Sequence, residues 1–169
     1  YAQTMNNNVM RWTVSGVRND STTSLQSFYW RDTLPTDAVR LTRLVTGTYS
    51  TTQTYKVTFT TNLNSQWRTA YDNLSTAKNY TLDMSSAALG LASNEYVTQF
   101  MLSFGIVPAG FHQLTNATVD AQTLYALTNG YKFTNKADVG GLLGGNWVQS
   151  IARWTTSVYS HYVPAKPAA

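Results

Sequence analysis

The stretch SFYWRDTLP, residues 27–35, combines the residue types best suited to chemistry in this chain. Tyr29 and Trp30 carry flat rings with polar edges, the kind of surface on which a sugar ring stacks. Asp32 is a carboxylate that either takes part in chemistry or ends a strand before the turn at Pro35. Both interpretations stay open at this point. The aromatic residues that could form a stacking platform are Trp12, Phe28, Tyr29, Trp30, Trp67, Trp147 and Trp154.

Residues that would support catalysis are few. The chain has two histidines, His112 and His161, and one glutamate, Glu95. Glycoside hydrolysis would need a pair of carboxylates, which would have to be Glu95 and one of the aspartates. The sequence contains no G-x-S-x-G motif and no cysteine, which leaves no serine-hydrolase signature, thiol catalyst or cysteine-bound zinc. We therefore expect a protein that is not an enzyme and has no metal or other cofactor.

Strands are expected to position these residues, because most of the chain alternates between polar and apolar residues. The clearest cases are residues 9–17 and 54–62. Since successive side chains of a strand point to opposite faces, Tyr29 and Trp30 must lie on opposite sides of a sheet. Further strands are expected over residues 25–34, 38–50, 79–85, 92–105, 131–139 and 146–160, with a flexible glycine-rich break at 140–145.

One segment follows a different period. In residues 64–77, Trp67, Ala70, Tyr71 and Leu74 recur at helical spacing. The pattern predicts a short helix inserted between strands, which would cover neighbouring aromatic rings.

Composition narrows the class of protein. Hydrophobic residues make up 43% of the chain, enough for a core, whereas charged residues make up only 12%. The polar surface then depends on Thr, Ser, Asn and Gln, which is typical of extracellular β-structure. The net charge of +4 is dispersed, with no run of Lys or Arg, so we expect no nucleic-acid partner. No stretch is long and apolar enough to cross a bilayer, so we expect no membrane insertion.

The order of several motifs resembles a known family. WTVSGVRNDSTTSLQSFYWRDTLP, residues 12–35, combines a strand, a polar turn, an apolar strand and a D-x-L-P element. AVRLTRLVTGTY, YKVTFTTN, LGLASNEYVTQFMLSFGIVPAGF and FTNKADVGG follow in order. Together they resemble the immunoglobulin-like conserved-repeat domains of Gram-positive (Firmicutes) cell-surface and cell-wall-anchored proteins. The resemblance implies a structural or adhesive module of a stalk, and an architectural role for Asp32.

Some domains of related surface proteins form an amide crosslink between a lysine and an asparagine. The reaction needs a neutral amine and a carboxylic acid that transfers protons. In the usual arrangement the lysine lies in the first strand, where this chain has Arg11 instead. The alternation of residues 54–62 also places Lys56 on a solvent face. The candidate residues for such a crosslink are Lys56, Asn135, Asp32 and Glu95, with Lys132 as a second lysine.

These observations predict an all-β domain over residues 1–162, an immunoglobulin-like β-sandwich with Greek-key connections, followed by a Pro/Ala-rich linker at 163–169. The expected function is non-catalytic: a spacer or stalk module, or part of an adhesin, outside the cell and attached to the cell wall. The expected partners are neighbouring domains of a larger surface protein and, for an adhesin, a host glycan or matrix protein. The alternative is a carbohydrate-binding module that uses Tyr29, Trp30 and Trp67 as stacking aromatics.

Overall fold

The computed structural model describes residues 2–5, 9–35, 38–124, 132–149 and 157–161. These ranges are all-β, built from antiparallel strands joined by turns and loops. They contain no helix long and apolar enough to cross a membrane. Trp154 and the predicted linker at 163–169 lie outside the described residues.

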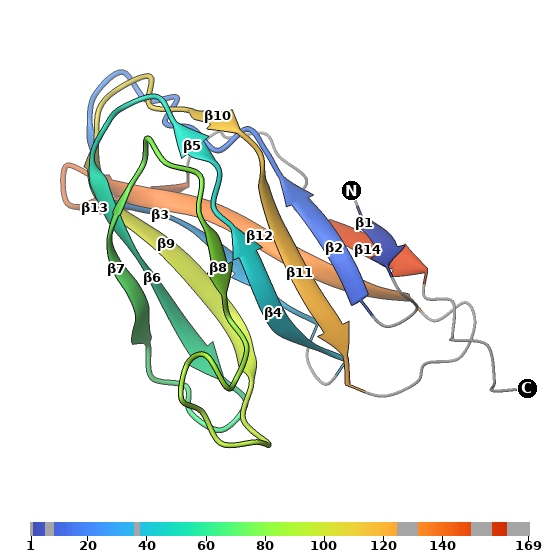
Figure 1. Ribbon diagram of the computed structural model, residues 1–169. Coiled ribbons are helices and arrows are strands. Elements are labelled where there is room, and N and C mark those ends of the chain that lie inside the picture. The colour runs from blue at the N-terminus through green and yellow to red at the C-terminus, as the bar shows by residue number, and fades with distance from the viewer. Residues whose placement is uncertain (1, 6–8, 36–37, 125–131, 150–156, 162–169) are drawn as a thin grey trace, which may run out of the picture.

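Two antiparallel sheets carry the fold, an arrangement consistent with a β-sandwich (Figure 1). The larger sheet contains β3 (Leu25–Thr33), β6 (Thr54–Thr61), β7 (Arg68–Ser75), β9 (Val97–Val107), β12 (Lys132–Leu143), β13 (Asn146–Gln149) and β14 (Ser157–His161). Its order is β13-β12-β3-β9-β6-β7, and β14 also pairs with β12.

The smaller sheet contains β1 (Ala2–Met5), β2 (Val9–Val14), β4 (Val39–Val45), β8 (Thr81–Asp83) and β11 (Ala117–Thr123). Its order is β1-β2-β11-β4-β8. A separate short pair is formed by β5 (Thr48–Tyr49) and β10 (Gln113–Thr115).

The core lies between the sheets, and β2 and the second half of β3 bury every second side chain toward it. On β2, Met10, Trp12 and Val14 are buried, whereas the residues between them are half-buried on the outer face. On β3, Trp30 is fully buried, and its indole Nε1 donates a hydrogen bond to Tyr49 Oη at 2.9 Å. The buried side chains of both sheets form one continuous hydrophobic cluster, so the described strands share a single core.

The helix predicted over residues 64–77 is wrong, because this segment contains strand β7. The helical spacing has a local cause. Leu74 lies opposite Tyr55 and Tyr71 lies opposite Val57, so three residues of β7 span the distance that two residues of β6 span. Such a bulge inserts one residue and shifts the alternation. Asn73 takes up the extra length with a positive φ of 54°.

The glycine positions were also predicted wrongly. β9 does not end at Gly105 but continues to Val107, with Gly105 at a φ of +73° where the pairing with β3 is irregular. The expected break at 140–145 lies largely within β12, which runs through Gly140 and Gly141 to Leu143. Only Gly144 and Gly145 form a turn between strands. Backbone pairing therefore continues through Gly105, Gly140 and Gly141, and at Gly140 the absence of a side chain leaves room for the Tyr29 ring.

A row of charged residues crosses the outer face of the smaller sheet. Asp120 on β11 lies opposite Arg11 on β2 and Arg43 on β4. Arg11 donates two hydrogen bonds to the carboxylate, at 2.7 and 3.0 Å, and Arg43 donates two at 2.9 and 2.7 Å. Burial opposes ionisation of Asp120, but the hydrogen bonds and charges of the two arginines outweigh it and lower the pKa of the carboxyl.

Replacing Asp120 with asparagine is expected to reduce the free energy of unfolding by about 1–3 kcal/mol at pH 7, because charge-assisted hydrogen bonds are lost. A carboxyl with a lowered pKa contributes stability at neutral pH and loses it as the pH falls. The effect should therefore shrink below about pH 4. Urea unfolding at pH 7 and pH 3 measures the free energy of unfolding at both pH values. Asp20→Asn is the control, because Asp20 forms an exposed ion pair with Arg18. An equal loss at both pH values would contradict a role for the charge.

Candidate functional site

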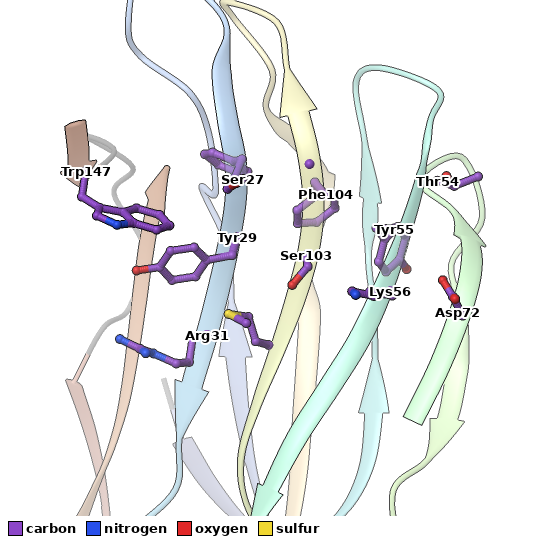
Figure 2. A pocket seen from close by; sticks show the side chains of 13 residues that line it. Ser27, Tyr29, Arg31, Thr54, Tyr55, Lys56, Asp72, Ser103, Phe104 and Trp147 are labelled. Atoms are coloured by element: carbon purple, nitrogen blue, oxygen red, sulfur yellow. The ribbon is translucent and has the colours of Figure 1, made fainter. Parts of the chain in front are cut away.

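An open groove with a volume of about 700 Å³ lies on the outer face of the larger sheet, in the described part of the chain. It runs across β3, β9, β6 and β7, and Trp147 of β13 closes one end (Figure 2). Four residues in one cross-strand row determine its shape: Gly140 faces Tyr29, Tyr29 faces Ser103, and Ser103 faces Lys56. The small Ser103 between two long side chains leaves the hollow.

Tyr29 forms an aromatic wall whose orientation is fixed by its neighbours. Its Oη donates a hydrogen bond to Asp138 Oδ2 at 3.2 Å. Arg31 binds the same carboxylate through two hydrogen bonds, each 2.9 Å long, and its guanidinium carbon lies 5.6 Å from the centre of the Tyr29 ring. The Trp147 ring meets the Tyr29 ring edge-on, with centroids 6.2 Å apart. The two rings therefore stand together at one end of the groove.

Gly140 is required for this arrangement. A Cβ atom at this position would lie 2.8 Å from Tyr29 Oη and 3.1 Å from two ring carbons. Real Cβ atoms do not approach that closely, so any side chain here would displace the ring. The glycine in β12 thus provides the surface on which the Tyr29 ring lies.

The charges at the Tyr29 wall are balanced. Burial and then the negative charge of Asp138 raise the pKa of the Tyr29 phenol, so it stays protonated and acts as a donor at neutral pH. The hydrogen bonds to Asp138 raise the pKa of Arg31, which keeps its positive charge beside the carboxylate. A ligand at this wall meets aromatic rings next to a neutralised ion pair.

The opposite wall is polar. Lys56 and Asp72 are exposed there, with the hydroxyl of Thr54 close by (Figure 2). Among the described residues, Lys56 makes no ion pair, so its ammonium is available to a ligand. The groove therefore combines an aromatic end with an end that offers a cation, an anion and hydroxyl groups.

The three aromatics predicted for stacking have different positions. Tyr29 is half-buried and lines the groove, whereas Trp30 is fully buried in the core, so the two residues do lie on opposite faces. Trp67 is 39% exposed between β6 and β7 and does not line the groove. Trp147, 65% exposed, is the second ring of the site.

Asp32 points into the core rather than to solvent. It is fully buried, and Asn135 Nδ2 donates a hydrogen bond to its Oδ2 at 2.6 Å. The other carboxyl oxygen of Asp32 and the amide oxygen of Asn135 have no hydrogen-bond partner. Burial raises the pKa of Asp32 to about 8, against the opposing effect of the Asn135 hydrogen bond. Asp32 is therefore mostly protonated at neutral pH.

The structure brings together only part of the crosslink set. Asp32 and Asn135 are in contact in the core, whereas Lys56 is exposed on the outer face of β6. Glu95 lies elsewhere, accepting hydrogen bonds from Thr61 Oγ1 at 2.6 Å and from Arg68 Nη2 at 2.7 Å, and these lower its pKa. The described residues include no cluster of three or more His, Asp or Glu side chains able to hold a metal ion. The position of the Lys132 side chain is outside the described part of the structure.

The fold and the groove define a class of protein, an all-β domain with an open groove on one sheet face. Comparisons of the chain with models of protein families, with curated proteins and with solved structures gave no match. Because a fold alone does not determine function, the groove is the feature of this domain that bears on its function.

Proposed function

We propose that this protein is a non-catalytic module of a bacterial cell-surface protein, located outside the cell and attached to the cell wall, and that it acts in adhesion. The observation that carries the adhesive role is the groove, where Tyr29 is held in place by its neighbours and the exposed Trp147 packs edge-on against it on an open sheet face. Exposed rings with fixed geometry are typical of binding surfaces. The motif order shared with Gram-positive conserved-repeat domains supports the location at the cell surface.

The strand pairing supports an immunoglobulin-like fold as part of this proposal. The seven principal strands in chain order are β2, β3, β4, β6, β9, β11 and β12. In a constant-type immunoglobulin domain, the first, second, fifth and fourth strands form one sheet, and the third, sixth and seventh form the other. Here the seventh, second, fifth and fourth strands are neighbours, as are the first, sixth and third. The arrangement corresponds to that fold with its first and last strands exchanged.

A spacer needs no ligand, whereas an adhesive module must bind one, so a binding experiment distinguishes the two roles. Beads coated with the domain are expected to adhere to surfaces carrying host glycans or matrix proteins, and adhesion should be lost in Tyr29→Ala and Trp147→Ala. Trp67→Ala is the matched control, because it removes an exposed indole outside the groove. The measurement is the number of beads retained under flow. Beads that fail to adhere to any surface, or that adhere equally with all three variants, would leave the spacer role alone.

A further inference from the structure

We infer that the groove is a saccharide-binding site for a short, uncharged oligosaccharide, with one sugar ring against Tyr29 and Trp147 and the next within reach of Lys56 and Asp72. This inference rests on the proposed adhesive function and names the ligand class of the same site.

The aromatic end of the groove suits a sugar ring. Sugars have apolar C–H faces that pack on aromatic rings, and hydroxyl edges that need hydrogen bonds. Tyr29 is held by Asp138 and by the adjacent Arg31 guanidinium, so little side-chain freedom is lost when a ligand packs on it. A ring fixed before binding lowers the entropic cost of association.

The polar end excludes a purely apolar ligand. Lys56 and Asp72 would be covered without hydrogen bonds by such a ligand, which is unfavourable for charged groups. Sugar hydroxyls can accept from the Lys56 ammonium and donate to the Asp72 carboxylate. The hydroxyls of Ser27, Thr54 and Ser103 add further partners around the same hollow.

Charge balance points to a neutral saccharide. Arg31 is paired with Asp138 through two hydrogen bonds, so it is already neutralised. Lys56 and Asp72 contribute one charge of each sign. A volume of about 700 Å³ lies within the range of 300–1,000 Å³ typical of small-ligand sites, which suits an oligosaccharide rather than a single sugar.

The test uses defined probes and the signal of one residue. Chitotriose, cellotriose, maltotriose and lacto-N-tetraose, with a sialylated trisaccharide as the charged comparison, are titrated to millimolar concentration into the isotope-labelled protein. At least one neutral probe is expected to shift the indole N–H resonance of Trp147, which is assigned by its loss in Trp147→Phe. The resonances of Trp12 and Trp30, which are buried in the core, should not move.

Variants separate stacking from polar recognition. Tyr29→Ala should weaken binding about tenfold or more, a typical effect for an aromatic contact residue. Gly140→Ala should weaken it similarly, because the new Cβ displaces the Tyr29 ring. Lys56→Gln and Asp72→Asn should weaken it several-fold, whereas Trp67→Ala should leave it unchanged. Thermal unfolding of each variant shows whether the domain remains folded, and Tyr29→Phe provides a milder change at the same position.

The outcomes distinguish this inference from the adhesive role. If beads adhere through the groove but no saccharide shifts Trp147, the ligand class is wrong and adhesion stands. A preference for the sialylated probe would overturn the assignment to neutral saccharides. A Trp147 shift that depends only on protein concentration would identify a second copy of the chain as the occupant and would overturn the inference.

Discussion

The Asp32→Asn variant is expected to be more stable than the natural protein at pH 9, by roughly 5 kcal/mol, and similar to it at pH 4. Burial raises the pKa of Asp32 to about 8, whereas its ordinary value is 3.8. The folded protein therefore retains a proton that the unfolded chain releases between these two values. The stability contributed by this group is complete below pH 3.8 and is lost as the pH rises through 8.

The size of this effect follows from the pKa difference. About four pKa units separate the folded and unfolded states, and each unit corresponds to about 1.4 kcal/mol. An asparagine has no proton to release, and its amide oxygen can still accept the hydrogen bond from Asn135. The variant therefore keeps the hydrogen bond with Asn135 but no longer has a carboxyl group that titrates at this position.

Urea unfolding of both proteins at intervals from pH 4 to pH 9 measures the difference. Asp120 and Glu95, whose pKa values are lowered, affect both proteins equally and cancel in the comparison. Asp83→Asn is the control, because Asp83 is exposed and its pKa is lowered by Ser85. A stability difference that stays constant across this range would contradict the buried titration of Asp32.

The second large effect is expected from Trp30→Ala, which should reduce the free energy of unfolding by about 3–5 kcal/mol. Trp30 is fully buried and packs edge-on against Phe100, with ring centroids 5.4 Å apart. Its removal leaves a cavity and takes away the hydrogen bond to Tyr49. Trp30→Phe keeps much of the volume and loses the hydrogen bond, so a smaller reduction of about 1–2 kcal/mol is expected.

Trp147→Ala is the matched comparison for this prediction. The Trp147 side chain is 65% exposed, so its removal should change stability by less than about 0.5 kcal/mol. Chemical denaturation at pH 7 measures all three variants. A loss at Trp147 as large as that at Trp30 would contradict the assignment of one indole to the core and the other to the groove.

Alternation in the sequence predicted which side chains of a strand share a face. Met10, Trp12 and Val14 are buried together, and Tyr29 and Trp30 are separated by the sheet, as the period of two required. The sequence of β7 wrongly predicted a helix, because a bulge at Asn73 gives its apolar residues a spacing of three. A bulge depends on the partner strand, so the segment's own sequence did not identify it.

The site was predictable only in part. The alternation of a strand separated Tyr29 from Trp30 but did not say which of the two would lie outside the core, and the outer ring was expected to be covered by a helix. Trp147 belonged to the set of possible platform residues. The contacts of Tyr29 with Asp138 and Gly140 depend on the register between β3 and β12, which no local pattern specifies. The sequence did not predict the burial of Asp32 for a related reason. A carboxylate three residues before a proline suggests an exposed strand end, yet Asn135 accompanies it in the core.

The positions of β2 and β12 within their sheets have a mechanical consequence. β2 lies between β1 and β11, and β12 has β3 on one side and β13 and β14 on the other, so neither strand is at the edge of its sheet. In a chain of linked modules under tension, the load would enter through β1 and β14, which lie outside β2 and β12 in the chain, and would then reach β2 and β12. Each would have to slide past neighbours on both sides, breaking several backbone hydrogen bonds at once rather than one at a time. In a surface protein exposed to flow, the inner positions of β2 and β12 would resist further stretching once the load had passed β1 and β14.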